Sequence, residues 1–525
     1  MKFHTVLNRM AFAALLLAAG PTFAQSFRVQ CPNGTQLHPS TTDAKGKVVA
    51  NPGIKCQHIA GGDGFATMAD GNQIYLFGFG PLSGLASLQN AAGLAPGAYG
   101  AYVGTEPASE FNKSYAGAIV ADGSSVANIK KDGTAAAGAS FDAAITEPAM
   151  MMNMGVLSAD IPAPLFAVDE DDEFFLTLSN VGMIMRPDLF EQHTVHWHGY
   201  PNASSYFDGV PDASVAINIA GSFTYYYTAP DAGTYFWHCH ITPPEHLQMG
   251  MVGQLYVRPR QNTVTALNPA PTSALRDKLV NTYKYVNTNS TQGSTANATY
   301  DPCTIDILCS SPIPPAPAAS TTQPQGAKYA YNDGDASTRY DVEYPIQMHG
   351  FDPNFHFIGM TFNPEPFADM KDKYFLLNGR SYPDTANPDV ISTQASDGVT
   401  RPSQPLPALI TINRTAGQTR ALLRIADLSV TEYSTLATVG VPMTVIGFHA
   451  RMLRDLAGNN MAYQTNSITI GGGESLDVIL DVSDAAYSAC GGATPCTFFL
   501  YSTNLDHLSN DAENFGGMMT EIKIL

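Results

Sequence analysis

Short runs of branched and aromatic residues, separated by turn-forming residues, dominate the hydrophobic pattern of this chain. Examples are residues 174–178, 223–227, 409–412 and 478–480, each bounded by turn signals. Glycine and proline recur throughout, and no long stretch has the 3.6-residue period of an amphipathic helix. The pattern therefore predicts an all-β protein built from β-sandwiches.

A change in composition divides the chain near its middle. Residues 262–340 are rich in Pro, Ser, Thr, Asn and Gln, which is typical of a linker or a long insertion. We therefore predict a front domain over residues 25–261, this Pro/Ser/Thr-rich segment, and a back domain over residues 341–525. Residues 1–24 precede the front domain and differ from it in composition.

The two halves look like diverged copies of one another. Four segments correspond in the same order: 176–180 with 423–427, 193–199 with 434–440, 236–240 with 499–503, and Gly250-Met251 with Gly517-Met518. In this alignment the back half has lost every histidine of the front half, and its cysteine. Any chemistry that those residues carry is therefore expected in the front half.

The first 24 residues have the organisation of a secretory signal. Lys2 and Arg9 form a positive end, residues 10–20 an apolar run, and Thr22-Phe23-Ala24 a small-residue cleavage site. No later run approaches the roughly 18 apolar residues of a membrane span. We expect a secreted protein, located in the periplasm, with no membrane span.

The formal charge of −19 disfavours nucleic acid and anionic membranes as partners. It would instead attract a basic redox partner or a cationic substrate, although a charge of this size also serves solubility alone. Charge by itself does not choose between these roles.

Seven cysteines leave one without a partner, whatever the pairing. Six lie in near pairs that disulfides could join in an oxidising compartment: Cys31 with Cys56, Cys303 with Cys309, and Cys490 with Cys496. The sequence alone leaves the pairing open. Cys239 stands apart between two histidines, and metal ligation supplies a reason for an unpaired thiol there.

Six of the 13 histidines lie between residues 193 and 246. On a strand, His196 and His198 would share one face. His238 and His240 would likewise share a face of a second strand, with Cys239 pointing to the opposite side. Two such strands can hold metal ions between their imidazoles and a separate metal at the thiolate.

The metal at the thiolate is expected to be copper. A soft thiolate, two imidazoles and a weak thioether form the ligand set of an electron-transfer copper. The sequence offers His193, Cys239, His246 and Met251 for these roles. His238 and His240 flank Cys239 covalently, so an electron could pass from this copper to a neighbouring cluster.

The segments HTVHWHG (193–199) and WHCHITPPEHLQMGM (237–251) resemble the paired copper motifs of the multicopper oxidases, the laccase and ascorbate oxidase family. The resemblance implies two cupredoxin-like Greek-key β-sandwiches and an oxidase that couples one-electron oxidation of a metal ion or phenol to reduction of dioxygen. It also implies a role for each ligand: His193, Cys239, His246 and Met251 hold type 1 copper, His196 holds type 2, and His198, His238 and His240 hold type 3.

The sequence departs from the family pattern in its histidine count. A full type 2/type 3 cluster in the family uses eight histidines, and these motifs supply four. We therefore expect a homo-oligomer, a trimer by analogy with two-domain members, in which a neighbouring chain completes the cluster. The candidates for this role are His349, His356, His449 and His507.

Two other functions stay open on the sequence alone. Copper nitrite reductases share the architecture and the type 1 ligand set, and a non-enzymatic electron shuttle would need type 1 copper alone. Asp208 and Glu245 are candidate acid/base residues for an enzyme of either kind. A methionine cluster at residues 150–154 could receive Cu(I) or could simply cover a core.

Overall fold

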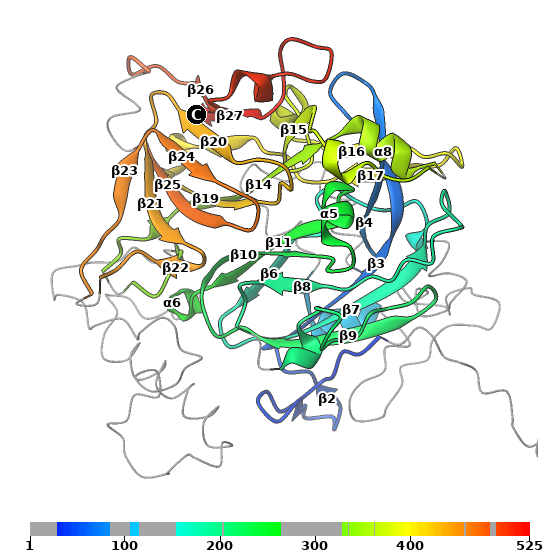
Figure 1. The fold of residues 1–525 in the computed structure, drawn as a ribbon. Coiled ribbons are helices and arrows are strands. Elements are labelled where there is room, and N and C mark those ends of the chain that lie inside the picture. The colour runs from blue at the N-terminus through cyan, green and yellow to red at the C-terminus, as the bar shows by residue number, and fades with distance from the viewer. Residues whose placement is uncertain are drawn as a thin grey trace, which may run out of the picture.

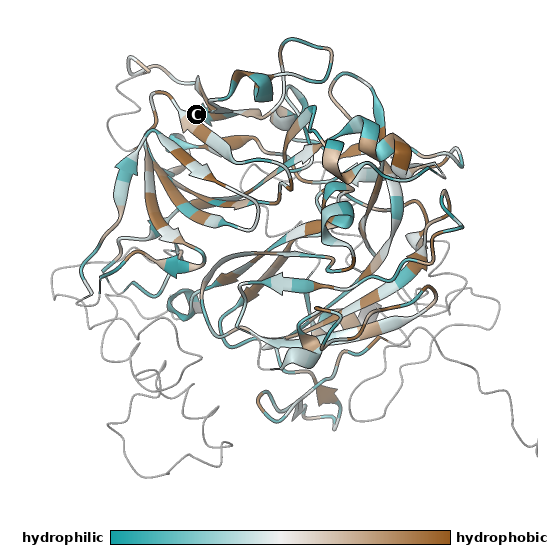
Figure 2. Cartoon of the chain, in the orientation of Figure 1, coloured by the Kyte–Doolittle hydropathy of each residue, from teal (hydrophilic) through white to brown (hydrophobic). Residues whose placement is uncertain are grey.

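Strands dominate the structure, as the hydrophobic pattern predicts (Figure 1). The computed structural model describes residues 29–83, 105–114, 154–201, 204–263, 328–333, 335–361, 363–455, 458–482 and 490–525. The predicted signal segment, Met150–Met152, the Cys303/Cys309 pair and most of the predicted linker lie outside these residues. Hydrophobic and hydrophilic positions alternate along many of the strands, as expected for sheets with one face in a core (Figure 2).

Two main sheets make up most of the described front half. One has the order β4 (Gln73–Pro81), β3 (Ile54–Thr67), β7 (Glu173–Gly182) and β9 (Ser222–Thr228), with β5 (Glu106–Pro107) also paired to β3. The other has the order β6 (Phe166–Asp169), β11 (Val252–Arg258), β10 (Gly233–His238) and β8 (His196–His198). The pairs β3–β7 and β6–β11 are parallel, and the other pairs are antiparallel.

The back half repeats this plan. Its larger sheet has the order β15 (Tyr374–Leu377), β14 (Val342–Phe351), β19 (Arg420–Asp427), β25 (Ser475–Asp481), β21 (Met443–Phe448) and β22 (Arg451–Met452), with β23 (Tyr463–Thr465) on β21. Its smaller sheet has the order β18 (Ile410–Ile412), β27 (Met519–Ile524), β26 (Cys496–Ser502), β20 (Ser434–Thr438) and β24 (Ser467–Ile470). Here β14–β19 and β18–β27 are the parallel pairs.

This topology agrees with the alignment of the two halves. Strands β7 and β19 hold corresponding places, each with a parallel neighbour on one side and an antiparallel neighbour on the other. In the smaller sheets, β8 corresponds to β20 and β10 corresponds to β26. In each sheet these two strands are antiparallel neighbours. The chain therefore contains two β-sandwiches of one plan, and the histidine motifs lie in the front one.

The remaining elements are short. The small ladders are β1 (Thr41–Thr42) with β2 (Val48–Val49), β12 (Lys328–Tyr329) with β13 (Arg339–Tyr340), and β16 (Ile391–Gln394) with β17 (Thr400–Gln404). The α-helices are α3 (Ala108–Ser114), α5 (Pro243–Gln248), α6 (Arg260–Thr263) and α8 (Pro353–Gly359). The 3₁₀ turns are η3 (Ser205–Phe207), η5 (Phe367–Asp369), η6 (Asp384–Ala386), η7 (Arg414–Ala416) and η8 (Leu505–Leu508). Across the described residues, no helix is long and apolar enough to cross a membrane.

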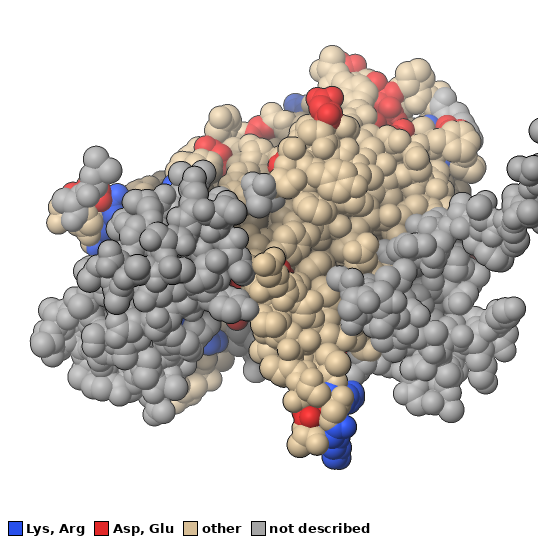
Figure 3. Space-filling view, turned by 90° about the horizontal axis from the view of Figure 1, so that it is seen from below, with Lys and Arg blue, Asp and Glu red and all other residues tan. Residues whose placement is uncertain are grey.

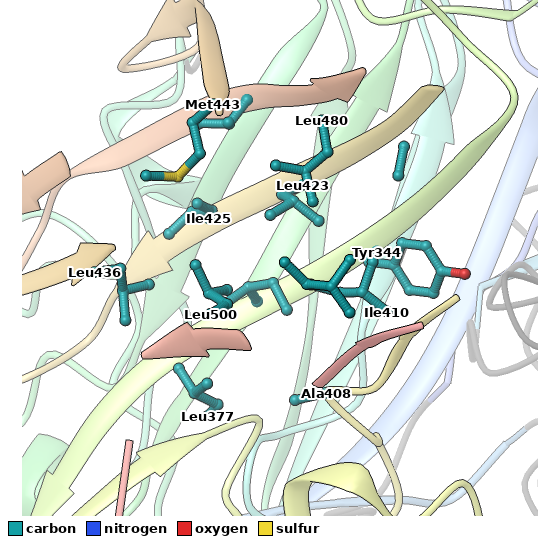
Figure 4. Packing of buried hydrophobic residues seen from close by; sticks show 14 of the residues in the cluster. Tyr344, Leu377, Ala408, Ile410, Leu423, Ile425, Leu436, Met443, Leu480 and Leu500 are labelled. Atoms are coloured by element: carbon teal, nitrogen blue, oxygen red, sulfur yellow. The ribbon is translucent and has the colours of Figure 1, made fainter. Parts of the chain in front are cut away.

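Each sandwich has its own hydrophobic core. Leu423, Ile425 and Leu480 are among the side chains that fill the back core (Figure 4). Both tryptophans of the protein, Trp197 and Trp237, are buried in the front core. Burial of a large apolar side chain stabilises a fold by about 1.5–3 kcal/mol, so these cores hold the sheets in place.

A buried polar network joins the two halves. The Arg424 guanidinium donates to Glu343 at 3.0 Å, and the Arg424 carbonyl accepts from the Gln254 side-chain amide at 2.8 Å. The Thr234 hydroxyl donates to the Asp477 carboxylate. Because these groups are buried and hydrogen-bonded from one half to the other, they fix the sheet that carries the histidines against the back half.

The cysteines behave as expected wherever the structure describes them. Cys31 and Cys56 form one disulfide, and Cys490 and Cys496 form another. Cys239 is buried and is the free cysteine of the described part of the chain.

Figure 3 shows one face of the molecule, on which the described surface is largely uncharged, acidic residues lie near one edge and basic residues gather at a projecting tip.

Candidate metal centre

Strand pairing brings the histidines of the two motifs together. Strands β8 and β10 are antiparallel neighbours, with His196 opposite His238 and Trp197 opposite Trp237. Side chains alternate along a strand, so the imidazoles lie on one face of the sheet and the indoles on the other. Trp237 stacks on Phe166 in the front core, with ring centroids 4.5 Å apart. The tryptophans are therefore core residues that anchor the strands carrying the ligands.

The first group of donor atoms surrounds the free thiol. Atoms of His193, Cys239 and His246 lie within 4.8 Å of one another, and all three residues are buried. The His246 Nδ1 atom is 3.2 Å from the Cys239 Sγ atom. The Thr194 backbone N–H also donates to this sulfur, at 3.4 Å, and would support a negative charge on it.

The loop after Cys239 folds back on itself and carries the other two predicted ligands. Pro243, Pro244 and Glu245 form the first turn of helix α5. Proline is tolerated there because the first N–H groups of a helix have no partner within it. The Met251 N–H then donates to the His246 carbonyl at 2.8 Å, and the Met251 carbonyl accepts from the Cys239 N–H at 3.1 Å. Met251 is fully buried in the same core cluster as Cys239.

The chemistry of this group fits copper. Both ring nitrogens of His193 and the Nε2 atom of His246 are buried without a hydrogen-bond partner, which is costly unless a ligand uses them. Burial lowers the pKa of His193 well below its usual value and that of His246 to about 3, so both imidazoles are neutral, as ligation requires. Burial raises the pKa of the Cys239 thiol to about 11, so a bound cation is needed to ionise it.

The second group consists of imidazoles alone. Donor atoms of His196, His198 and His238 lie within 4.8 Å of one another. The His196 Nδ1 atom is 2.7 Å from the Asp208 carbonyl, and the His238 Nδ1 atom is 2.8 Å from the Cys239 carbonyl. A carbonyl only accepts, so each Nδ1 carries the proton and each Nε2 is left for a metal. Burial, with smaller effects of the neighbouring imidazoles, lowers the pKa of His238 to about 3 and that of His198 to about 4.

His240 lies at the side of this group. Its ring centroid is 5.1 Å from that of His196 and 5.7 Å from that of His238. Its backbone N–H donates to the Thr194 hydroxyl at 2.9 Å. The four imidazoles predicted from the two motifs are thus neighbours, with three of them in the tighter group.

The sequence that carries these donor groups is similar to a known protein family. A family model described as multicopper oxidase matches residues 141–262, which include all eight predicted ligands. This segment is therefore similar in sequence to a multicopper oxidase domain. Multicopper oxidase MCE of Talaromyces pinophilus is 32% identical over 112 residues, which cover 21% of this chain and 17% of that protein. Multicopper oxidase MmcO of Mycobacterium tuberculosis is 35% identical over 81 residues, covering 15% and 14%.

The matched region thus spans less than a fifth of either curated relative. Among solved structures, the blue copper oxidase of Nitrosomonas europaea has a TM-score of 0.47 and 17% identity over 89% of this chain and 85% of that one. The sequence similarity of residues 141–262 to multicopper oxidases supports copper as the cofactor.

In the described part of the chain, the back-half histidines do not join the imidazole group of the front half. The ring nitrogens of His356 face two backbone carbonyls, those of Tyr75 and Gln248. The Nδ1 atom of His349 is 2.9 Å from the Leu428 carbonyl. The Nε2 atom of His349 is buried without a hydrogen-bond partner, but neither residue belongs to a group of converging donor atoms in the described part of the chain.

The other two candidates differ from each other. His507 lies between Ser502 and the Glu432 carboxylate. His449 is half-exposed, with its Nε2 atom 3.7 Å from Glu474, and it interacts electrostatically with His198. Of the four, His449 is therefore the one placed on the side of the imidazole group.

The two predicted acid/base residues lie beside different donor groups: Asp208 beside His196, and Glu245 on the side of His246. The Asp208 carboxylate is 3.4 Å from the His196 Nδ1 atom, at the imidazole group. Glu245 instead meets Glu365 and lies in the field of Glu191, on the side of His246; burial and these two carboxylates raise its pKa to about 8. Sequence reasoning missed Glu191 and Glu365, because no local motif connects them to His246.

The methionine cluster lies almost wholly outside the described residues. Met154 is described and packs against the small core around the Cys31–Cys56 disulfide. Met183 and Met185 pack in or against the front core. Met154, Met183 and Met185 are therefore packing residues.

Proposed function

We propose that this protein is an exported copper oxidase. His193, Cys239, His246 and Met251 would hold a type 1 copper, which would accept single electrons from a reducing substrate. The imidazoles of His196, His198, His238 and His240 would hold a second copper centre, which would supply the four electrons that, with four protons, reduce dioxygen to water. Bound copper supplies the one-electron redox chemistry. The observation that carries this proposal is the covalent link between the two donor groups: Cys239 belongs to the first group and the adjacent His238 to the second.

The protein residues have separate tasks in this scheme. The Cys239–His238 peptide connects the two donor groups through bonds rather than through solvent. The backbone carbonyls that hold the Nδ1 protons of His196 and His238 orient the second set of imidazoles. Asp208 is close enough to this set to deliver protons, since its carboxylate lies 3.4 Å from the His196 ring.

The proposal includes export and an oligomer. The first 24 residues support export, and the two disulfides support an oxidising compartment. Four imidazoles are half of a full cluster, which supports a trimer in which a neighbouring chain adds ligands. The domain boundaries at residues 25–261 and 341–525 belong to the same proposal.

Copper content and spectra test the proposal directly. The purified oligomer is loaded with copper, and its copper per chain, optical spectrum and paramagnetic resonance are measured with oxygen consumption. We expect an intense blue band, a second copper signal and oxygen uptake. Cys239→Ser should remove the blue band, whereas His196→Ala should keep it and lose the second signal. A single blue copper without a second signal would refute the oxidase and leave an electron shuttle; a colourless protein would refute both.

A nitrite reductase is the second candidate. It is favoured by the compactness of the His196, His198 and His238 group, which suits one copper ion, with His240 to the side. Nitrite consumption under argon, compared with oxygen consumption in air, separates the two enzymes. Turnover of nitrite alone, with one type 2 signal per chain, would replace the oxidase by the reductase.

A further inference from the structure

The four predicted type 1 ligands lie on two different parts of the front half. Cys239 directly follows strand β10, and the backbone of His193 forms a β-bridge, so both belong to the sheet framework. His246 and Met251 lie instead on residues 243–251, which we call the ligand segment and which contains helix α5. The geometry of the ligand set therefore depends on where the ligand segment lies against the sheets.

Helix α5 cannot fix the ligand segment by itself. It has six residues, and the side chain of its N-cap residue, Thr242, makes no capping hydrogen bond. Isolated helices of this length are not stable in water. The position of the helix must therefore come from contacts with other parts of the molecule.

Of the two ligands on this segment, His246 depends more on such contacts. The Met251 carbonyl accepts from the Cys239 N–H at 3.1 Å, which ties Met251 to the end of β10. The His246 backbone bonds to Thr242 and to Met251, which belong to the same loop. A shift of the loop would therefore carry the His246 ring with it.

Gln248, two residues after His246, bonds to the back half through its side chain. It is fully buried, and its amide donates to the Asp372 carboxylate at 2.9 Å and to the Gly350 carbonyl at 3.2 Å. A Cβ at position 350 would collide with the Asp372 carboxylate, so the glycine allows this close approach. The Thr431 hydroxyl donates to the other oxygen of Asp372 and holds that carboxylate in place.

Two buried histidines of the back half meet the same segment. The His356 Nε2 atom is 2.9 Å from the Gln248 carbonyl, and its Nδ1 atom faces the Tyr75 carbonyl of β4. A neutral imidazole has one N–H, so it donates to one of these carbonyls at a time. His349 interacts electrostatically with the backbone of Leu247 and Gln248. His356 thus links helix α5 to β4, and His349 adds a second contact from the back half.

Close packing completes the contact with the ligand segment. A Cβ at Gly359, in helix α8, would lie 3.0 Å from the Met249 Cε atom, and one at Gly250 would lie 3.6 Å from the Phe351 ring. On the other side, the Phe77 N–H of β4 donates to the Met249 carbonyl at 3.0 Å. Helix α5 accordingly lies beside β4 and near α8 (Figure 1). The ligand segment is held between a strand of the front half and elements of the back half.

We propose that the back half, which lacks the predicted copper ligands, positions those of the front half. Asp372, His349 and His356 are positioning residues in this view. They hold the ligand segment and so set where the His246 ring lies relative to Cys239. This gives a role to two histidines that stand outside both donor groups. The inference rests on the proposed type 1 copper site, whose geometry it explains.

Two glutamines provide a matched pair of variants. Gln248 and Gln254 are both fully buried, and each has an Oε1 atom without a hydrogen-bond partner. Each donates through its amide to the back half, Gln254 to the Arg424 carbonyl at 2.8 Å. Gln248→Met and Gln254→Met therefore remove comparable contacts between the halves, but Gln248 alone lies in the ligand segment.

Hydrogen exchange in the copper-free protein measures how firmly the segment is held. We expect Gln248→Met to speed exchange of the Met249 and Met251 amides about tenfold, because the segment opens more often when its buried hydrogen bonds are lost. Gln254→Met should leave these two amides nearly unchanged. Thermal unfolding, measured alongside, should show a similar loss of stability in both variants.

Spectra of the copper-loaded oligomer measure the consequence for the metal. Gln248→Met should weaken type 1 copper binding about tenfold, in competition with a chelator, and should change the copper hyperfine splitting, because residues that support a metal ligand affect affinity on this scale. Asp372→Ala should have the same effect. Asp372→Asn keeps an acceptor oxygen for Gln248 and should retain the wild-type spectrum. Gln254→Met should change neither affinity nor spectrum.

Each outcome decides the inference. Wild-type exchange and wild-type spectra in both Gln248→Met and Asp372→Ala would overturn it and leave the oxidase standing, and so would equal changes in Gln254→Met, which would indicate general loosening. Asp372→Ala carries the test if Gln248→Met does not fold. If the wild-type protein forms no blue copper, the oxidase fails, and exchange in the copper-free protein still decides whether the back half holds the ligand segment.

Discussion

Replacement of His193 by leucine should affect the copper-free and the copper-loaded protein in opposite directions. In the copper-free protein, both ring nitrogens of His193 are buried without partners. Each such atom costs about 1–3 kcal/mol, so two cost at least about 2 kcal/mol. Leucine has a similar volume, and an imperfect fit beside Gly61 would cost about 1 kcal/mol. We therefore expect His193→Leu to leave copper-free stability unchanged or to raise it by about 1–2 kcal/mol.

With copper the sign reverses. A ligand present at about a thousand times its dissociation constant stabilises the native state by about 4 kcal/mol, and His193→Leu should lose most of this gain. Urea unfolding followed by tryptophan fluorescence is a suitable assay, because Trp197 and Trp237 both lie in the front core and report on that half. Each variant is measured with a chelator and with excess copper, and His58→Leu, a buried histidine bonded to Ser179, is the control.

The control should behave in the ordinary way. Loss of the His58–Ser179 hydrogen bond strands the hydroxyl, so His58→Leu should destabilise both forms by a similar amount, about 1–3 kcal/mol. If His193→Leu also destabilised the copper-free protein by more than about 2 kcal/mol, its ring nitrogens would have partners there. The role of His193 as a metal ligand would then be refuted.

Three further predictions concern acid stability, proton release and a disulfide. Burial alone would raise the pKa of Glu343, but Arg258 and Arg424 lower it from 4.5 to about 2. The ionised carboxylate therefore contributes about 3 kcal/mol to the free energy of unfolding. This contribution is complete above pH 4.5 and is lost as the pH falls towards 2. Glu343→Gln should remove this part of the acid transition in urea titrations between pH 2 and 5, and an unchanged profile would contradict the assignment. Burial raises the pKa of the Cys239 thiol to about 11, so at pH 7 the thiol should release one proton when type 1 copper binds, while the neutral imidazoles release none. A pH-indicator dye measures the released proton. The variant Cys239→Ser should release none. The Cys31–Cys56 disulfide closes 25 residues, so the double serine variant should lose about 3 kcal/mol of unfolding free energy, and a loss below about 1 kcal/mol would show that this loop is already ordered without it.

Several features of this protein depend only on short-range physics, and the sequence was sufficient to predict them. Turn residues and branched runs determine strands locally, so the β class and the strands at residues 174–178 and 223–227 were predictable. Side-chain alternation places His196 and His198 on one face of a strand without knowledge of the partner strand. The odd number of cysteines, with Cys239 set between two histidines, is visible in the sequence alone and is enough to single out this thiol.

Other features depend on which segments the fold brings together, and no local pattern announces them. Glu191 and Glu365 lie 174 positions apart in numbering, and both meet helix α5 only because the two sandwiches pack around it. His356 is unsuited to ligation because the Tyr75 and Gln248 carbonyls occupy its ring. The ligand motif is thus local chemistry, whereas the carboxylates that meet helix α5, and the contacts that occupy the His356 ring, are consequences of long-range packing.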